Sequence, residues 1–378
     1  MDVEPLNLLE YETAALTCLS PMARDYYQSG AWDETTLRDN RAAFARYVLR
    51  PRVLVDVSQR DLSTEILGQK LGSPLLVAPT AFQGLAHPEG ELATARAAAK
   101  AGVGMVLSTM ATQSLESVAA AGSCSALAPL PHRSPQWFQL YVHRDRGLTR
   151  SLVERAEQAG FQALCLTVDA PVLGRRERDM RNRFQLPAGM TLANLASNAD
   201  LGIPSVRASA PLAHGSESSL FTYFIHQIDP TLSWKDLEWL AGCTPLPIVV
   251  KGILRGDDAL RCLEHGAKGI IVSNHGGRQL DGAIASLDAL PDVVEQVGKA
   301  ATVLIDGGIR RGTDVLKALA LGAKGVLLGR PILWGLAVAG EAGVLRVLQL
   351  LQDELSVAMA LCGCAHLSEV DPSLIKAV

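Results

Sequence analysis

The residues best suited to chemistry in this sequence are a histidine and an arginine in the motif SNHGGRQLD, which covers residues 273–281. Histidine is the usual proton acceptor near neutral pH, and the planar fork of arginine fits a carboxylate. His275 and Arg278 therefore predict a general base beside an anion site. Asp169 follows another apolar run, LCLTV, and is expected to orient the imidazole and stabilise its charged form.

Lys251 stands at the end of the apolar run PIVVK. An ammonium group in such a place is costly to bury unless it meets a negative partner. Two roles stay open for it from the residues alone. It is either a nucleophile that forms a Schiff base, as in an aldolase, or a fixed positive charge beside an anionic cofactor.

The two apolar runs nearest the C-terminus each end in glycine followed by arginine. Glycine lets a backbone N–H approach an oxyanion closely, and arginine binds phosphate through a fork of donors. The residues concerned are Gly307, Gly308, Arg310, Gly329 and Arg330. They predict a phosphate-binding site.

The elements that must position these residues are short apolar runs separated by helical segments. Each run is continuous over four to six residues, which is typical of a buried parallel strand. Helices between the runs end at glycines such as Gly102 and Gly322. We therefore predict an α/β fold, a TIM (β/α)8 barrel whose chemistry lies at the C-terminal ends of the strands, with an open doubly wound sheet as the alternative. The runs begin at Leu75, Gly104, Trp137, Leu164, Pro247, Ile270, Thr302 and Val326.

The chain is expected to form a single domain, residues 1–378, in which the remaining segments are additions to the barrel. Residues 1–73 form an N-terminal extension, with helical stretches at about 7–29 and 33–46 and a β-hairpin over 53–72. The barrel covers 74–350. The longest interval between two barrel strands follows the fourth strand. Its Ala-, Ser- and Pro-rich part, at about 187–232, is predicted to form a lid. Residues 351–378 are predicted to be a helical tail.

The composition excludes several classes of protein. The net charge of −4 gives no support to nucleic-acid or membrane-surface binding. No long apolar run or signal segment predicts a membrane span, and the seven scattered cysteines show no C-x-x-C zinc spacing, so no metal site is expected. P-loop, Rossmann and zincin motifs are missing from the sequence. We expect a reduced, cytoplasmic enzyme.

Taken together, the motifs resemble those of the FMN-dependent 2-hydroxy acid oxidases, a family that includes glycolate oxidase, lactate oxidase and mandelate oxidoreductases. SNHGGRQLD is the family's signature. DYYQSGA at 25–31, APTAFQGLAHPEGE at 78–91 and DGGIRRGTDVLKALALGA from Asp306 also match. The resemblance runs nearly end to end, from Tyr11 to about Leu367.

This resemblance implies an FMN cofactor over the barrel mouth and a 2-hydroxy acid beside it. The expected FMN-binding residues are Pro79, Thr80, Ala81, Ser108, Gln139, Tyr141, Thr167, Lys251, Ser273, Asp306, Gly307, Gly308, Ile309, Arg310, Gly329 and Arg330. The expected substrate-binding residues are Tyr26, Phe82, Met110, Tyr141, Arg176, His275 and Arg278. His275, Asp169, Tyr141 and Lys251 carry the catalysis, with His275 taking a proton from either the α-carbon or the hydroxyl.

The implied reaction is oxidation of an L-2-hydroxy acid to the 2-oxo acid, with oxygen as acceptor and hydrogen peroxide as product. Met110 stands where many glycolate oxidases carry tryptophan, and Phe82 where the family often has methionine. The smaller Met110 favours L-lactate or a broad range of 2-hydroxy acids. The alternatives are a glycolate oxidase, a (hydroxy)mandelate oxidase or dehydrogenase with another acceptor, a Schiff-base aldolase, and a flavin-binding sensor. The family resemblance also implies a homo-oligomer, a tetramer.

Overall fold

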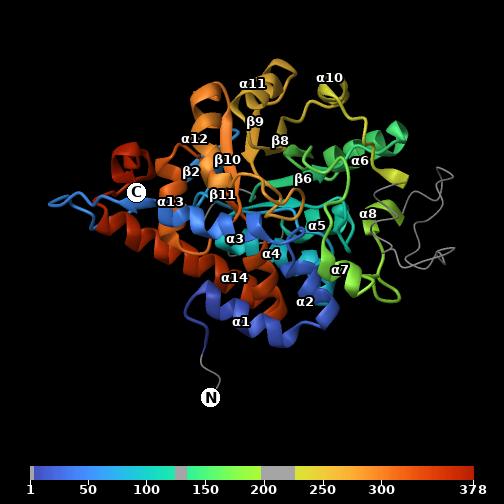
Figure 1. The fold of residues 1–378 in the computed structure, drawn as a ribbon, viewed down its shortest axis with the longest axis horizontal. Coiled ribbons are helices and arrows are strands. Elements are labelled where there is room, and N and C mark those ends of the chain that lie inside the picture. Colours follow the sequence, from blue (N-terminus) through green and yellow to red (C-terminus); the bar gives the residue numbers. More distant parts are fainter. Residues whose placement is uncertain (1–3, 124–133, 197–225) are drawn as a thin grey trace.

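The centre of the fold is a closed barrel of parallel strands surrounded by helices (Figure 1). The computed structural model describes residues 4–123, 134–196 and 226–378. In chain order the barrel strands are β4 (Leu75–Val77), β5 (Gly104–Leu107), β6 (Gln136–Leu140), β7 (Ala163–Thr167), β8 (Ile248–Ile253), β9 (Gly269–Val272), β10 (Thr302–Asp306) and β11 (Gly325–Leu328), and β11 closes the circle on β4. Each predicted apolar run forms one of these strands. The (β/α)8 barrel is confirmed, and the open sheet is excluded.

Alternate side chains of each strand point into the barrel or out towards the helices. One buried cluster fills the interior and includes Trp137, Cys165, Val249, Ile271 and Leu304. The intervening residues of the same strands join the larger cluster between strands and helices. Because one face of each strand packs in the barrel interior and the other against helices, the strands are apolar throughout. This continuous apolar pattern is what predicts them from the sequence.

The outer layer consists of helices that follow the barrel strands in the chain. They are α4 (Gly90–Ala101), α5 (Leu115–Ala121), α6 (Arg146–Gln158), α10 (Trp234–Cys243), α11 (Gly256–Glu264), α12 (Ser286–Val297), α13 (Gly312–Ala320) and α14 (Arg330–Leu361). Gly102 ends α4 in the left-handed conformation, and its N–H bonds the carbonyls of Ala98 and Ala99. The left-handed backbone at this position therefore explains why a glycine ends the helix.

The N-terminal extension forms the predicted helices, divided into shorter pieces. These are α1 (Leu8–Cys18), α2 (Pro21–Gln28), α3 (Thr35–Ala42) and the 3₁₀ turn η1 (Ala43–Arg46). Ser20 caps α2 and Pro21 occupies its first position, so the stretch 7–29 contains two helices. In Figure 1 these blue helices lie beside α14, on which α1 packs.

The predicted hairpin over 53–72 is shorter than expected. Its strands are β2 (Thr64–Ile66) and β3 (Gln69–Leu71), joined at Leu67 and Gly68, which both have positive φ as a tight hairpin turn requires. Ile66 and Leu71 join the barrel-interior cluster and cover the N-terminal end of the barrel. Residues 53–63 form no strand beyond a single bridge at Asp61, because Val53 and Leu54 are exposed and have no partner face.

The predicted C-terminal helical tail is wrong in part. The helix α14 begins at Arg330, bends at Ala339 and Gly340, and ends at Leu361. After two 3₁₀ turns, η4 (Leu367–Glu369) and η5 (Pro372–Leu374), the chain ends in strand β12 (Ile375–Ala377), which pairs antiparallel with β1 (Tyr47–Leu49). This pairing joins the N-terminal extension to the C-terminal residues, which are far apart in the sequence, so no local pattern predicts it.

The length and composition of α14 alone would allow it to cross a membrane. It is nevertheless mostly buried within the fold and packs against α1, α4 and α13. Such burial is typical of a core helix.

Two short helices, α7 (Glu177–Arg181) and α8 (Ala193–Ala196), follow the fourth barrel strand. Most of the predicted lid at 187–232 lies outside the described residues.

Candidate active site

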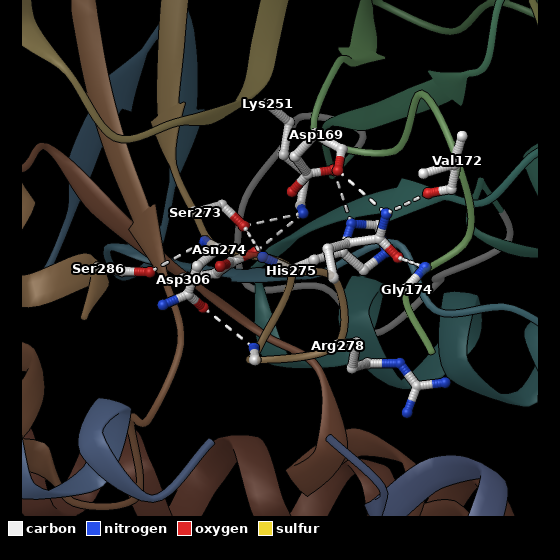
Figure 2. A network of polar contacts seen from close by, with 12 residues as sticks. Asp169, Val172, Gly174, Lys251, Ser273, Asn274, His275, Arg278, Ser286 and Asp306 are labelled. Carbon is white, nitrogen blue, oxygen red and sulfur yellow. Dashed lines mark hydrogen bonds and ion pairs between the residues drawn. The ribbon is translucent and has the colours of Figure 1, made fainter. Parts of the chain in front are cut away.

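A polar pocket lies at the C-terminal end of the barrel, where the ends of the parallel strands meet. Twenty of the residues predicted from the sequence line it, namely Tyr26, Pro79, Thr80, Ala81, Ser108, Met110, Gln139, Tyr141, Thr167, Arg176, Lys251, His275, Arg278, Asp306, Gly307, Gly308, Ile309, Arg310, Gly329 and Arg330. Asp169 and Ser273 do not line the pocket but bond to residues that do (Figure 2). The fold therefore gathers the expected residues in one place.

The general-base candidate is held by a carboxylate. His275 Nδ1 lies 2.8 Å from Asp169 Oδ1, as drawn in Figure 2. This bond places the proton on Nδ1 and leaves Nε2 free to accept another. Burial lowers the pKa of His275, although Asp169 works in the opposite direction. The imidazole is therefore neutral, and able to act as a base, near pH 7.

The backbone at His275 has a φ of 59°, a left-handed conformation that is uncommon for a residue other than glycine. The next two residues, Gly276 and Gly277, also have positive φ. The turn follows β9 and directs the imidazole past the end of β8 towards Asp169, which follows β7. Strain of this kind persists only where the surrounding contacts hold it.

Lys251 is buried inside β8 and is not its last residue, because the strand continues irregularly to Ile253. Its Nζ donates to Ser273 Oγ at 3.0 Å and lies 3.3 Å from Asp306 Oδ2. Burial alone would lower the pKa of Lys251, but Asp306 and Asp169 outweigh it and raise that pKa. Lys251 is thus a fixed ammonium at the floor of the pocket.

Two arginines, Arg176 and Arg278, form a second cationic group, on the side of the pocket near the N-terminal extension. Arg278 stacks over the Tyr26 ring, with 4.9 Å between the guanidinium carbon and the ring centre, and donates to the carbonyls of Tyr26 and Ser29. Burial and neighbouring Arg278 lower the pKa of Arg176 to about 10. A buried guanidinium and a half-buried one that repel each other favour an anion between them. Tyr141 also lines this part of the pocket.

The glycine-arginine pairs lie together at the other end of the pocket. Gly307 and Gly308 have φ of 100° and 80°, and a Cβ on Gly308 would collide with the backbone of Asn40. Burial lowers the pKa of Arg310 to about 10, and burial with Arg278 and Arg310 lowers that of Arg330 to about 9. Within the described ranges neither arginine has a carboxylate partner in an ion pair. This end fits a phosphate.

Buried polar atoms between the two cationic ends test whether FMN, the cofactor implied by the resemblance, fits the pocket. Gln139 Nε2, Thr167 Oγ1 and Asp306 Oδ1 have no hydrogen-bond partner within the described structure. Buried polar groups are normally paired, so these atoms call for a polar ligand. A flavin ring with ribityl hydroxyls and a phosphate supplies the matching groups, and the residues therefore fit FMN.

One predicted substrate residue is misplaced. Phe82 is predicted to bind the substrate, but it does not line the pocket. It is buried behind Tyr26, with ring centres 5.5 Å apart, and also stacks on Phe184. Its carbonyl accepts a hydrogen bond from the Tyr27 hydroxyl at 2.6 Å. Phe82 thus supports Tyr26 and has no access to a substrate.

Other residues of the site could not be predicted from the sequence. Tyr27, Leu173 and Leu333 line the pocket as apolar or aromatic side chains, which carry no distinctive sequence signal. Asn40 of α3 was missed too. It exchanges two side-chain hydrogen bonds with Asn274, each 2.8 Å, and accepts from the Ser286 N–H. It anchors the His275 loop to the N-terminal extension, and this contact depends on tertiary packing alone.

Comparisons with known proteins agree with this geometry. The family model for FMN-dependent dehydrogenases matches residues 15–377. The chain is similar to an L-lactate oxidase of Nostoc sp., at 64% identity with 98% of each chain covered. It is also similar to the glycolate oxidase of Spinacia oleracea, at 50% identity over 99% of this chain and 96% of that one. A crystal structure of mandelate oxidase with (S)-4-hydroxymandelic acid superimposes with a TM-score of 0.90, at 41% identity and with 99% of each chain covered.

Proposed function

Since this chain belongs to the family of FMN-dependent dehydrogenases, we propose that it oxidises an L-2-hydroxy acid to the 2-oxo acid and reduces oxygen to hydrogen peroxide. The reaction balances as R–CHOH–COO⁻ + O₂ → R–CO–COO⁻ + H₂O₂. Bound FMN would take up the two electrons of the oxidation and return them to oxygen. The observation that carries the proposal is His275, which lines a pocket with a cationic group at each end and is held from behind by Asp169.

The residues that would hold FMN divide along the length of the pocket. Gln139, Thr167 and Asp306 offer unpartnered polar atoms to the ring and ribityl chain, and Lys251 places its ammonium beside them. The phosphate would lie at the second end, against the backbone of the 307–308 turn and the side chains of Arg310 and Arg330. Ser273 would act through Lys251, whose ammonium it binds.

The substrate carboxylate is expected to lie between Arg176 and Arg278, where it relieves their mutual repulsion. A carboxylate in this position also orients the substrate, because guanidinium groups bind it through a planar fork. Tyr26 and Tyr141, which also line the pocket, carry hydroxyls that can donate to the substrate. Burial raises the pKa of both tyrosines, so both stay protonated donors.

His275 accepts the proton that leaves the substrate. Its Nε2 is the available nitrogen, and Asp169 stabilises the imidazolium that forms. The proton comes from the α-carbon in a carbanion mechanism and from the hydroxyl in a hydride mechanism. The same base serves both routes.

The geometry argues against a Schiff-base aldolase. A lysine that attacks a carbonyl must be a neutral amine. The Lys251 ammonium has Asp306 as an ion-pair partner at 3.3 Å, and its pKa is raised rather than lowered. A stable positive charge at this position suits an anionic cofactor instead.

L-lactate is the proposed substrate within this class. The high identity to an L-lactate oxidase supports it, as does Met110, a flexible side chain in the pocket wall that leaves room for a methyl group. The names of other relatives, glycolate and mandelate oxidases, keep a broader range as the alternative. The homotetramer and the cytoplasmic location stay predictions from the resemblance and the composition.

The proposal is tested with purified protein in an oxygen electrode. L-lactate should consume oxygen and yield an equal amount of hydrogen peroxide. If an artificial dye is reduced rapidly while oxygen is hardly consumed, the protein is a dehydrogenase with another acceptor.

A further inference from the structure

Gln279 connects the two loops that supply the reacting groups of the proposed site. It follows Arg278 in the loop after β9, the loop that also carries His275. Its amide Nε2 donates to the carbonyl of Asp169 at 3.0 Å and to that of Val172 at 2.8 Å, and its Oε1 accepts from the Gly174 N–H at 3.0 Å. One half-buried side chain thus makes three backbone bonds to the loop after β7.

The loop after β7 carries the groups that complete the site. Asp169 binds His275, and Arg176 lies opposite Arg278. Figure 2 shows Asp169, Val172 and Gly174 along this loop, facing the strand end that carries Ser273 and His275. The distance between the two loops therefore sets both the His275–Asp169 bond and the separation of the arginines.

Two further observations show that the loops are held in close contact. A Cβ on Gly174 would lie 2.6 Å from the Cα of Gln279, so the backbones approach too closely for any side chain. A Cβ on Gly252 of β8 would lie 2.5 Å from the Cβ of Asp169, which fixes Asp169 from its other side. Asp179 Oδ2 lies 3.7 Å from Arg176 Nη1, so this carboxylate offsets part of the repulsion between Arg176 and Arg278 and leaves the spacing of the loops to the backbone contacts.

We propose that Gln279 is a positioning residue, whose amide holds Asp169 against His275 and Arg176 opposite Arg278. The inference rests on the proposed function, because it assigns Gln279 to the geometry of that reaction. Gln279 acts through backbone bonds to Asp169 and Gly174 and through its Oε1, which accepts from Arg176 Nη2 at 3.5 Å, and it does not line the pocket itself.

The test is a double-mutant cycle on the FMN-loaded protein. Gln279→Met keeps the volume but removes the three bonds, and we expect L-lactate to reduce the flavin roughly tenfold to a hundredfold more slowly under anaerobic conditions. In an Asp169→Asn background the same substitution should cost less than about threefold, because the partner it positions is already altered. Equal losses in both backgrounds, or no loss in either, would overturn the inference.

A matched control comes from Gln352 of α14, another half-buried glutamine whose Nε2 binds Ser73 Oγ at 2.9 Å and the Ala101 carbonyl at 3.0 Å, outside the pocket. Gln352→Met should leave flavin reduction unchanged. Binding of the 2-oxo acid product, followed by oxidised-flavin absorbance, gives a readout without turnover, and Gln279→Met should weaken it several-fold.

The two proposals fail in different ways. If the unaltered protein is not reduced by any 2-hydroxy acid, the proposed function is wrong. If it is reduced normally and Gln279→Met behaves like Gln352→Met, only the role of Gln279 is wrong.

Discussion

The imidazole of His275 and the carboxylate of Asp169 lie 2.8 Å apart, although 106 positions separate them in the chain. Asp169 follows β7 and His275 follows β9, with β8 between these two strands in the barrel. Both residues are half-buried at the mouth of the barrel, where Lys251, on β8, lines the same pocket as His275. A base, its orienting carboxylate and a fixed cation therefore come from three consecutive strands.

Replacement of the base should separate chemistry from cofactor binding. His275→Ala is expected to keep its FMN, because the phosphate end and Lys251 are untouched. Flavin reduction by L-lactate should slow by at least about a hundredfold, the usual contribution of a general base. Anaerobic stopped-flow absorbance measures this, and a reduction rate close to that of the unaltered protein would remove His275 as the base.

The pH dependence follows from the burial of His275. Its protonated form cannot accept a proton, so kcat/KM should fall as the pH falls through its pKa. Burial lowers that pKa, and the acid limb should therefore lie below about pH 6.5, the value of an exposed histidine. Asp169 raises the pKa, so Asp169→Asn should shift the limb to still lower pH. A shift towards higher pH would contradict the pairing.

The anion site near the N-terminal extension is tested by a change that keeps the charge. Arg278→Lys loses the planar fork and the stacking on Tyr26. A charge-assisted hydrogen bond is worth about 1.5–3 kcal/mol, so KM for L-lactate should rise roughly tenfold to a hundredfold. FMN affinity, measured by flavin fluorescence, should change much less. If FMN is lost while KM is unchanged, Arg278 serves the cofactor instead.

Met110 is expected to influence which 2-hydroxy acid is preferred. Met110→Trp introduces a larger side chain into the pocket wall. The ratio of kcat/KM for L-lactate to that for glycolate should fall about tenfold, since the substrates differ by one methyl group. Steady-state kinetics with both substrates measures the ratio. An unchanged ratio would show that Met110 only fills space.

Asn40 provides a test of the N-terminal extension. Asn40→Ala leaves Asn274 without its amide partner and removes the acceptor of the Ser286 N–H. Unpaired buried groups cost about 1–3 kcal/mol each, so Tm should fall by several degrees, and FMN affinity should drop with it because the 307–308 turn packs on Asn40. Asn7→Ala, which removes the cap of α1, serves as control and should lower Tm alone.

Most of the barrel could be predicted because its signals are local. Apolar runs mark buried strands, and glycines such as Gly102 mark the helix ends. The strand ends then identified His275, Lys251 and Arg330 without any tertiary information. The β1–β12 pairing, the place of Phe82 behind Tyr26 and the bonds of Gln279 and Asn40 could not be predicted in this way. They depend on contacts between distant segments, whose local sequence is unremarkable.

The most direct test of the account is anaerobic reduction of the flavin by a panel of 2-hydroxy acids. The purified protein is mixed with L-lactate, D-lactate, glycolate or L-mandelate, and oxidised-flavin absorbance is followed. We predict rapid and complete bleaching by L-lactate, slower bleaching by glycolate and none by D-lactate. Bound FMN that none of these acids can bleach would contradict it and would favour a flavin-binding protein without this activity.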